Sequence, residues 1–565
     1  MEMTGARMLL ECLKREGVDL VFGYPGGYII NVFHELPNHP EIRHILCRHE
    51  QGAVHEADGY ARATGKVGVC MVTSGPGATN TVTGLATANA DSIPLVVISG
   101  QVNSHLIGND AFQEVDIVGI TRSCTKHNFL CQDLSKFPTV IRQAFHLARS
   151  GRPGPVLVDL PKDLQISTAE FVWPEEVRMR SYNPTYRPNL NQIRIACDLL
   201  TKARQPLILT GGGVISSNAS DLLRKLAHDY SIPVCSTLMG LGGFPGNDPL
   251  FLGLLGMHGT YVSNRAVSNA DLLITIGSRF SDRVTGRLSQ FAPKAKIVHI
   301  DIDPTSIRKN VEVEVPVVGD CRQALSGMLE VLAARKYDVE PDWKRDHAPW
   351  LSQLDDWRKS QPLSFTKGAN LKPQQVLQAL EKLAPEDAIF VTEVGQHQMW
   401  AAQFLTIKEP RTFISSGGMG TMGYGLPAAI GAQLGKPGNL VVDIAGDGSI
   451  QMNIQELQVA VSNRLPVKVL ILNNAYLGMV RQWQELFFER NYSFTDMSEQ
   501  PDFVKLAEAY GAEGYRISTE AELEELLPKA LRSPNPAIID ARVEREENVY
   551  PMVPSGAALD DMLLV

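Results

Sequence analysis

Two polar residues mark the ends of a short segment, residues 446–474, in this 565-residue chain. Asp447 lies between two glycines directly after the apolar run LVVDIA, and Asn474 ends the apolar run VKVLILNN. The stretch between them, MNIQELQVAVSNR, has the apolar periodicity of a helix. This pattern predicts one βαβ unit, whose right-handed crossover brings its two parallel strands close together. We therefore expect both polar residues at the carboxyl edge of a sheet, where α/β proteins bind ligands.

These residues carry the ligand atoms that Mg²⁺ prefers. Mg²⁺ takes hard oxygen ligands in octahedral geometry and often combines protein carboxylates with substrate phosphates. We expect Asp447 to supply a carboxylate, Asn474 an amide oxygen and Tyr476 a backbone carbonyl, with diphosphate oxygens and a water completing the shell. A Gly-Asp-Gly sequence alone is also compatible with a simple turn. The pair of polar strand ends favours a magnesium–diphosphate site.

The composition is that of a globular protein with an acidic balance. Charged residues make up 20% of the chain and its formal net charge is −9, without any basic run. Nucleic acid and anionic membranes are therefore not expected as partners, because both require a concentrated basic surface. No apolar run reaches the ~18 residues of a membrane span. The N-terminal stretch lacks the basic region and cleavage site of a secretory signal.

The eight cysteines are scattered from Cys12 to Cys321 and contain no Cys-x-x-Cys pair. Dispersed cysteines in a long chain are typical of a reduced intracellular protein. We expect them to be core residues rather than disulfides or catalytic nucleophiles, and we expect a cytoplasmic location.

Short apolar runs alternate with helix-length segments along the whole chain. The runs are VGVCMVTS, PLVVISG, PVLVDLP, PLILTGGG, DLLITIGS, KIVHIDID, LVVDIAG and VKVLILNN. They are nearly continuous in apolar residues, which is typical of parallel strands covered on both faces. The sequence therefore predicts an α/β fold.

Two stretches with few strand signals, residues 173–189 and 335–373, are interpreted as interdomain linkers. They leave blocks of about 1–165, 190–335 and 373–545, followed by a tail over 546–565. The first and third blocks share a glycine turn, a small-residue helix and an apolar strand, in SGPGATNTVTGLATANADSIPLVVISG and SGGMGTMGYGLPAAIGAQLGKPGNLVVDIAG. They can be two related domains that face each other across a site, or merely two α/β layers of similar type.

The Gly-Asp-Gly and Asn-Asn pair resembles the thiamine-diphosphate motif of the thiamine-dependent 2-keto acid enzymes. Nearly the whole chain resembles the large catalytic subunits of the acetohydroxyacid synthase (acetolactate synthase) family. The matching stretches include FGYPGG, CRHEQGA, TSGPGATN, DAFQEVD, SGRPGPVLVDLPKD, GMHGTYVSN, EVGQHQMW and GMVRQWQELFFERNYS. The resemblance implies three doubly wound parallel-sheet domains, which bind the pyrimidine (1–165), FAD (190–335) and the diphosphate with Mg²⁺ (373–545).

The resemblance also implies the reaction. Pyruvate is decarboxylated to hydroxyethyl-thiamine diphosphate, whose carbanion adds to a second 2-keto acid in branched-chain amino-acid biosynthesis. Pyruvate as the acceptor gives 2-acetolactate, and 2-oxobutyrate gives 2-aceto-2-hydroxybutyrate. Glu50 alone is compatible with an acid favoured at a helix start. In the family, the glutamate at this position hydrogen-bonds the aminopyrimidine and promotes ionisation of the thiazolium C2.

Further site residues follow from the matching motifs. The diphosphate is expected to contact Gln396, His397, Gly448 and Ser449, while Gly420 and Met422 hold the aminopyrimidine and the bent cofactor. Four residues are expected to reach the site from the partner subunit of a homodimer or higher homo-oligomer: Gly27, Phe112, Gln113 and Lys162. The acceptor keto acid is expected to meet Arg279, Met479 and Trp483.

The middle block contains LILTGGGVI, a strand that runs into glycines. NAD is not expected there, because the third glycine of the dinucleotide motif and the following acid are both missing. The resemblance instead implies FAD in a structural role, held by residues from several loops: Arg152, Met257, His258, Gly259, Arg279, Asp301 and Asp320. Ser281 stands where many relatives carry an acid, which leaves local flavin contacts open. Family members also pair with a small ACT-domain regulatory subunit.

Other functions are compatible with parts of the pattern. Pyruvate oxidase is a thiamine flavoenzyme with redox-active FAD, and glyoxylate carboligase lacks an equivalent of Glu50. A binding protein with an inactive thiamine site is disfavoured, because Glu50, Asp447 and Asn474 are all present.

Overall fold

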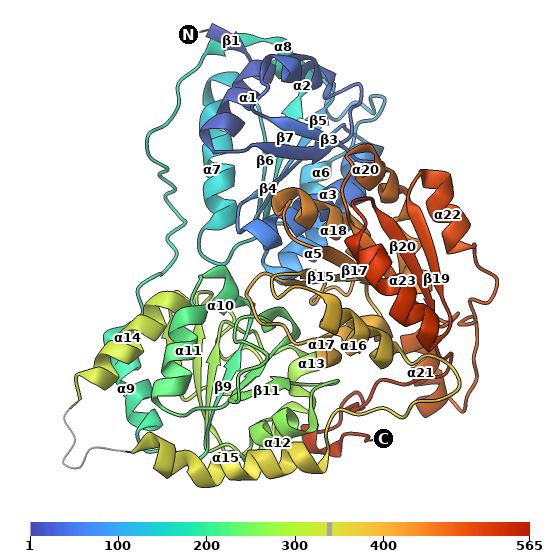
Figure 1. Cartoon of the computed structure of the whole chain (residues 1–565). Helices are drawn as coiled ribbons and strands as arrows, with labels where there is room; N and C mark the ends of the chain where they lie inside the picture. Colours follow the sequence, from blue (N-terminus) through green and yellow to red (C-terminus); the bar gives the residue numbers. More distant parts are fainter. Residues whose placement is uncertain (1, 336–341, 565) are drawn as a thin grey trace.

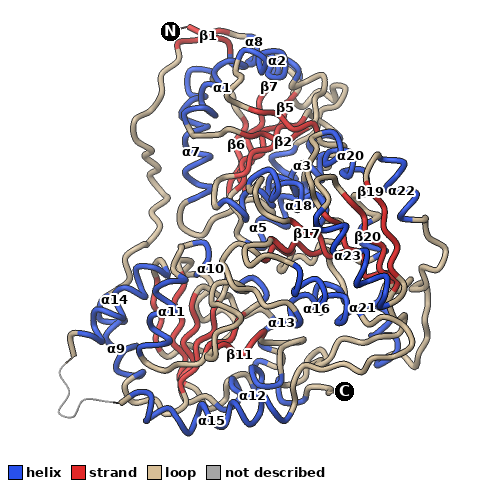
Figure 2. The backbone as a smooth tube through the Cα atoms, viewed as in Figure 1, coloured by secondary structure: helices blue, strands red, loops and turns tan. Residues whose placement is uncertain are grey.

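The computed structural model describes residues 2–335 and 342–564, so part of the linker expected at 335–373 lies outside the described residues. It contains three six-stranded parallel sheets (Figure 1). In this view the N-terminal domain is uppermost, the middle domain lies below it and the C-terminal domain lies to the right. Figure 2 shows each sheet enclosed by helices, with a long irregular segment connecting the first domain to the second. The predicted α/β fold of three doubly wound domains is confirmed.

The N-terminal and C-terminal sheets have the same topology. The first contains β2 (Leu20–Gly23), β3 (Arg43–Leu46), β4 (Gly68–Val72), β5 (Leu95–Gln101), β6 (His127–Leu130) and β7 (Pro155–Pro161). The other contains β15 (Ile389–Thr392), β16 (Phe413–Ser415), β17 (Val441–Ala445), β18 (Lys468–Asn473), β19 (Glu513–Ile517) and β20 (Ala537–Arg542). Their orders are β3-β2-β4-β5-β7-β6 and β16-β15-β17-β18-β20-β19. Counted within each domain, both orders are 2-1-3-4-6-5, as expected for two related domains.

The middle sheet is wound differently. It contains β9 (Pro206–Thr210), β10 (Val234–Ser236), β11 (Phe251–Leu254), β12 (Leu272–Ile276), β13 (Lys296–Asp301) and β14 (Val315–Val318). Its order β11-β10-β9-β12-β13-β14 is 3-2-1-4-5-6 within the domain, which is the order of dinucleotide-binding folds. One face is covered by α9 (Leu190–Leu200), α11 (Ser220–Asp229) and α14 (Cys321–Ala333), and the other by α12 (Tyr261–Asn269) and α15 (Trp343–Ser360).

Each of the eight apolar runs contains a strand of a parallel sheet, as predicted. The central strands β4, β5, β7, β9, β12, β17 and β18 are buried along their whole length. Helices cover both faces, so no polar alternation is needed. All eight cysteines are free, and seven of them are buried, which confirms that they are core residues.

The N-terminal and C-terminal domains of one chain share a core through two helices. α3 (Glu50–Thr64) packs against α18 (Gly425–Gly435). Glycines allow this close approach: a Cβ on Gly431 would lie 1.8 Å from the carbonyl oxygen of Glu56, and one on Gly59 would lie 2.0 Å from that of Ala428. α3, the helix that begins at Glu50, is therefore fixed against the C-terminal domain.

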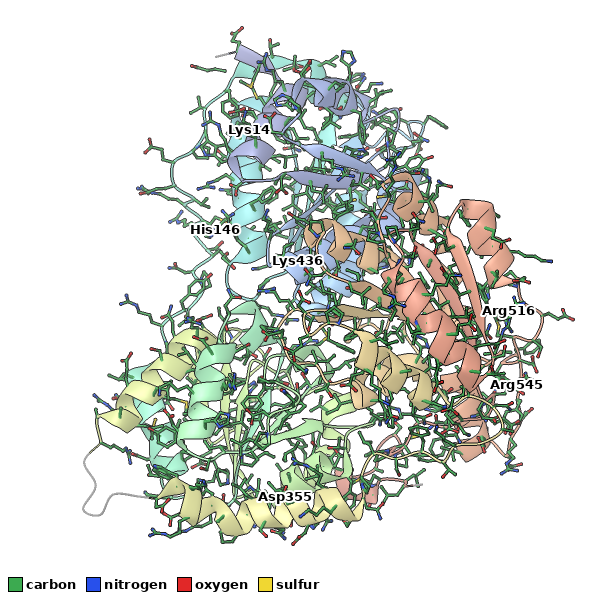
Figure 3. All side chains as sticks on the ribbon, in the orientation of Figure 1. Lys14, His146, Asp355, Lys436, Arg516 and Arg545 are labelled. Carbon is green, nitrogen blue, oxygen red and sulfur yellow. The ribbon has the colours of Figure 1, made fainter. Side chains whose placement is uncertain are left out.

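The second linker contains α15, whose buried face packs on the middle domain. Trp350 is 2% exposed and donates from Nε1 to the carbonyl of Pro206 at 3.0 Å. Figure 3 labels Asp355, an exposed residue of this helix, and places Arg516 and Arg545 at the edge of the C-terminal domain. No helix in the described part of the chain is both long and apolar enough to cross a membrane.

Candidate active site

The carboxyl ends of β17 and β18 hold the two polar turns. These strands are parallel neighbours, with Ala445 opposite Ile471. Asp447 begins α19 (Asp447–Ile450) after β17, and Asn474 directly follows β18. The predicted βαβ unit is confirmed. Its connection is divided into α19, the 3-10 helix η6 (Ile454–Glu456) and α20 (Leu457–Ser462) instead of one helix.

The environment of Asp447 suits a divalent cation. Asp447 is 1% exposed, and burial raises the pKa of its carboxyl to about 7. Among the described residues it has no ion pair of its own, because the nearby Arg542 is paired with Asp540 at 2.9 Å. A buried carboxylate without a counter-charge is unfavourable, and a bound Mg²⁺ would supply that charge. Asn474 is also buried; its side-chain oxygen accepts from the Tyr476 amide at 3.1 Å and keeps a second lone pair.

α17 (Gln396–Phe404) places two of the residues predicted to contact the diphosphate beside this turn. Gln396 Oε1 accepts from Asn474 Nδ2 at 3.2 Å. The His397 ring is buried, and burial lowers its pKa to about 3. Its Nε2 has no hydrogen-bond partner among the residues that the structure describes. A Cβ on Gly446 would lie 2.7 Å from this ring. His397 is therefore a neutral imidazole packed against the turn before Asp447, with one polar atom available to a ligand.

A buried carboxylate that the sequence analysis did not single out connects the remaining diphosphate and pyrimidine residues. Glu393 follows β15, and its side chain accepts from the backbone amides of Gly423 at 2.7 Å and Leu426 at 3.2 Å and from Ser449 Oγ at 2.6 Å. It therefore fixes Ser449 and the loop that carries Gly420 and Met422. Its sequence signal is an acid directly after a strand and before Gly-Gln-His.

Gly420 itself has φ +65°, and a Cβ there would meet only Val394, at 3.7 Å. The loop thus presents backbone next to open space, which suits close approach of a ligand. Gly448 differs: a Cβ there would lie 2.8 Å from Leu477 Cδ2, so a larger residue would disturb the turn after Asp447.

The residues predicted from the N-terminal block gather at the carboxyl edge of its sheet. Glu50 is the first residue of α3, and its Oε2 accepts from Asn80 Nδ2 at 2.9 Å. The others follow neighbouring strands: Gly27 after β2, Phe112 and Gln113 after β5, and Lys162 after β7. Phe112 is 79% exposed. A Cβ on Gly27 would meet no atom within 4 Å.

Glu50 and the turn that carries Asp447 lie at the carboxyl edges of two different sheets of the chain. Within residues 2–335 and 342–564, no hydrogen bond or ion pair joins Glu50 to Asp447, Asn474 or His397. The exposed Phe112 and the open space at Gly27 lie on the same edge as Glu50. This arrangement is compatible with a site completed by a second chain.

The residues predicted to hold FAD lie at the carboxyl edge of the middle sheet, together with Arg152 from the N-terminal domain. Arg152 forms an ion pair with Asp303 at 3.3 Å. Burial raises the pKa of Asp301 to about 6, while burial and the charge of Arg152 lower the pKa of Arg279. Asp320 is used as the N-cap of α14, since its side chain accepts from the Gln323 amide at 3.1 Å.

Met257, His258 and Gly259 follow β11 and meet the C-terminal tail. The Val553 amide donates to the Met257 carbonyl at 2.8 Å, and His258 Nδ1 lies 3.2 Å from the Pro551 carbonyl. His258 Nε2 is buried and has no hydrogen-bond partner within the described ranges 2–335 and 342–564. Ser281, the departure from the family pattern, precedes α13 (Asp282–Thr285) and is exposed, without a side-chain capping bond.

α21 (Gly478–Phe487) carries Met479 and Trp483. The guanidinium of Arg283 lies 5.9 Å from the Trp483 ring centroid, so Arg283 contacts this tryptophan from the middle domain. Arg283 was not among the predicted site residues, although it belongs to the same RFSDR stretch as Arg279. Gln482 Nε2 donates to the Val549 carbonyl at 3.0 Å, which ties α21 to the tail.

Comparison with known proteins identifies the family. Three family models match the chain: the "Thiamine pyrophosphate enzyme" N-terminal TPP binding domain over residues 3–120, the central domain over 193–328 and the C-terminal TPP binding domain over 393–541. The chain is 49% identical to the acetolactate synthase isozyme 3 large subunit of Escherichia coli, over 100% of this chain and 99% of that protein. It is 47% and 46% identical to the acetolactate synthase large subunits of Buchnera aphidicola subsp. Schizaphis graminum and Haemophilus influenzae, over 100% of this chain and 98% of each relative.

The chain belongs to the acetolactate synthase large-subunit family. The resemblance stated from its motifs is confirmed over the full length, and pyruvate oxidase is not favoured as the alternative. The N-terminal and C-terminal domains both match TPP binding domains of one enzyme family. This relationship accounts for the strand order that their sheets share.

Proposed function

We propose that this chain is the catalytic subunit of an acetolactate synthase, which joins pyruvate to a second 2-keto acid with loss of carbon dioxide. The observation that carries the proposal is the buried Asp447, which forms no ion pair within residues 2–335 and 342–564 and lies beside Asn474 at adjacent strand ends. Because the chain is similar to acetolactate synthases over its full length, we expect this position to hold a cation that binds a diphosphate.

Thiamine diphosphate and Mg²⁺ fit the residues of the C-terminal domain. Asp447, Asn474 and the Tyr476 carbonyl would hold the metal, while Gln396, His397 and Ser449 would contact the diphosphate. The cofactor, when bound, supplies a stabilised carbanion for decarboxylation and carbon–carbon bond formation. The protein contributes orientation, exclusion of water and control of protons.

Glu50 is the proton-handling residue in this proposal. Its carboxylate would accept a hydrogen bond from the aminopyrimidine and assist proton transfer between that ring and the reacting carbon. Asn80 orients the carboxylate, because its amide donates to Glu50 Oε2 at 2.9 Å. Gly77 keeps the space in front open: a Cβ there would lie 3.3 Å from Glu50 Oε1.

Two acceptor keto acids are proposed, pyruvate and 2-oxobutyrate. The indole of Trp483 offers an apolar face to the extra methyl group of 2-oxobutyrate. Arg283 lies over this indole and is a second candidate, beside Arg279, for binding the acceptor carboxylate. Met479 would contribute to the same pocket.

FAD is proposed in a structural role at the switch point of the middle sheet, since the net reaction transfers no electrons. A Cβ on Gly213 would lie 2.6 Å from Gly277 Cα, so the glycines after β9 and β12 bring the backbone of the two strand ends together. If FAD only shapes the site, a 5-deaza analogue should sustain carboligation. Product formation that depends on flavin reduction would support an oxidase instead.

Gly27, Phe112, Gln113 and Lys162 are proposed to enter the active site from a partner copy, and a small regulatory subunit is proposed as a further partner. The decisive test of function is product analysis of the purified chain with pyruvate and 2-oxobutyrate together, in the presence of thiamine diphosphate, Mg²⁺ and FAD. We expect both 2-acetolactate and 2-aceto-2-hydroxybutyrate. Acetate formation with oxygen uptake, or no turnover, would contradict the proposal.

A further inference from the structure

A fully buried cluster lies between the N-terminal and C-terminal domains, apart from the residues assigned above. It consists of Cys47 after β3, Glu56 in α3 and Glu456 at the end of η6. All three are 0% exposed, and one ligand atom from each lies within 4.8 Å of the others. Two buried acids at this distance require either a cation or a shared proton.

The hydrogen bonds favour a shared proton. Cys47 Sγ donates to Glu56 Oε2 at 3.3 Å. In the described part of the chain, Glu56 Oε1 has no partner when both acids are counted as ionised. Burial and the neighbouring Glu456 raise the pKa of Glu56 well above its usual value, whereas the pKa of Glu456 is raised only to about 7. Glu56 is therefore the more readily protonated acid of the pair, and a proton shared between the two neighbouring carboxyl groups avoids two buried negative charges.

The side chain of Glu456 accepts hydrogen bonds from the turn that precedes Glu50. The backbone amide of Arg48 donates to Oε1 at 3.2 Å and to Oε2 at 3.0 Å of Glu456. A Cβ on Gly52 would lie 2.5 Å from Glu456 Oε1, so only glycine lets this side chain reach the start of α3. Glu456 itself belongs to the βαβ unit that carries Asp447 and Asn474.

We propose that Glu456 is a positioning residue that fixes the β3–α3 turn in front of Glu50, with Glu56 and Cys47 holding its carboxylate in place. It thereby joins the two cofactor half-sites that one chain carries. The positioning role of Glu456 rests on the function proposed for Glu50. The hydrogen-bonded link between Glu456 and the turn does not depend on that function.

The test compares Glu456→Ala with Glu456→Gln, whose amide oxygen can still accept from Arg48 and whose NH₂ group can donate to Glu56. Backbone hydrogen–deuterium exchange of residues 43–52 is measured first, in the full-length chain without cofactors. We expect Glu456→Ala to speed exchange of the Arg48 amide by about tenfold or more, and Glu456→Gln to stay within about threefold of wild type. An Arg48 amide that is equally protected in Glu456→Ala would overturn the link.

Proton–deuterium exchange at C2 of bound thiamine diphosphate is measured second. A misplaced Glu50 should slow it by about 10- to 100-fold in Glu456→Ala, with recovery in Glu456→Gln. The control is Glu16→Ala, which removes another fully buried carboxylate, paired with Arg142 and Arg149. It should lower stability without changing either exchange rate.

The outcomes separate the two proposals. A loosened Arg48 amide with unchanged C2 exchange overturns the positioning role of Glu456, while unchanged C2 exchange in Glu50→Gln overturns the role of Glu50 itself. Metal analysis tests whether the cluster of Cys47, Glu56 and Glu456 binds a cation instead of sharing a proton. One equivalent of a divalent metal that stays in Asp447→Ala protein and is lost in Glu56→Gln would overturn the shared proton.

Discussion

Asp447 illustrates how a single buried acid can reveal a ligand. Its folded pKa of about 7 lies above the ordinary 3.8, so the folded state favours the protonated form. Its contribution to stability is therefore present below pH 3.8 and is lost as the pH rises towards 7. At pH 8, the metal-free protein must hold a carboxylate that the site disfavours.

We predict that Asp447→Asn, measured at pH 8 without Mg²⁺, unfolds at the same temperature as wild type or about 2 °C or more above it. The stabilisation that wild type gains from Mg²⁺ and thiamine diphosphate should be absent from the variant. Differential scanning fluorimetry with and without cofactor measures both effects. An Asn variant that is less stable without metal and still responds to cofactor would show that the metal lies elsewhere.

Glu50→Gln should preserve folding and cofactor binding but slow ionisation at C2, because an amide cannot share a ring proton as a carboxylate does. We expect slowing by about 100-fold or more, measured by proton–deuterium exchange at C2. Glu41→Gln is a suitable control, since Glu41 is a surface acid paired with Lys14 at 2.8 Å. Its exchange rate should equal that of wild type.

Trp483→Leu should change specificity more than turnover. Pyruvate and 2-oxobutyrate differ by one methylene, which an apolar pocket converts into about 10- to 200-fold discrimination. We expect the preference for 2-oxobutyrate to fall about tenfold or more, while acetolactate formation from pyruvate alone persists. Competition between both acceptors measures the product ratio.

The matched control is Trp357→Leu. Trp357 also lies beneath an arginine, with Arg265 at 5.2 Å from its ring centroid, but it lies on α15. This change should leave the product ratio unaltered. An unchanged ratio in Trp483→Leu would remove the specificity role, and equal loss of both products would make Trp483 a structural residue.

At the scale of the element, the junction of β17 and α19 depends on a small residue. A Cβ on Gly446 would lie 2.7 Å from the His397 ring, so Gly446→Ala must displace either the ring or Asp447. We predict a cost of about 1–3 kcal/mol in stability and a clearly higher requirement for thiamine diphosphate.

A second glycine-to-alanine substitution, at Gly438, serves as the control for Gly446→Ala. A Cβ on Gly438 would meet no atom of the described residues within 4 Å, and the φ of this glycine is not positive. Gly438→Ala should therefore match wild type in thermal unfolding and cofactor titration. If Gly446→Ala also matches wild type, the contact between His397 and the turn does not constrain the cofactor site.

At the scale of the whole molecule, the separation of Glu50 from Asp447 can be tested by combining two differently inactivated chains in one dimer. Co-expressed Glu50→Gln and Asp447→Ala chains form mixed dimers in which one interface site receives both intact residues. Activity of about a quarter of the wild-type value is expected after random pairing, although each variant alone is inactive. If each chain instead completes its own site, mixing restores nothing.

Much of this protein could be predicted from its sequence, because the decisive patterns are local. Buried parallel strands require continuous apolar runs, and all eight such runs became strands. Asp447 and Asn474 could be placed together because the crossover of a βαβ unit is right-handed and short. The family was evident from long motifs, since cofactor chemistry fixes residue types at those turns.

Contacts between distant segments were decided only by the tertiary structure. Glu393 gathers Gly423, Leu426 and Ser449, and Arg283 meets Trp483 across two domains. Glu456 reaches the turn before Glu50 through space left by a glycine. Such contacts join residues that share no periodicity or spacing. They depend on how whole sheets and domains pack; the packing of α3 on α18, for example, joins the two domains between which Glu456 reaches Arg48.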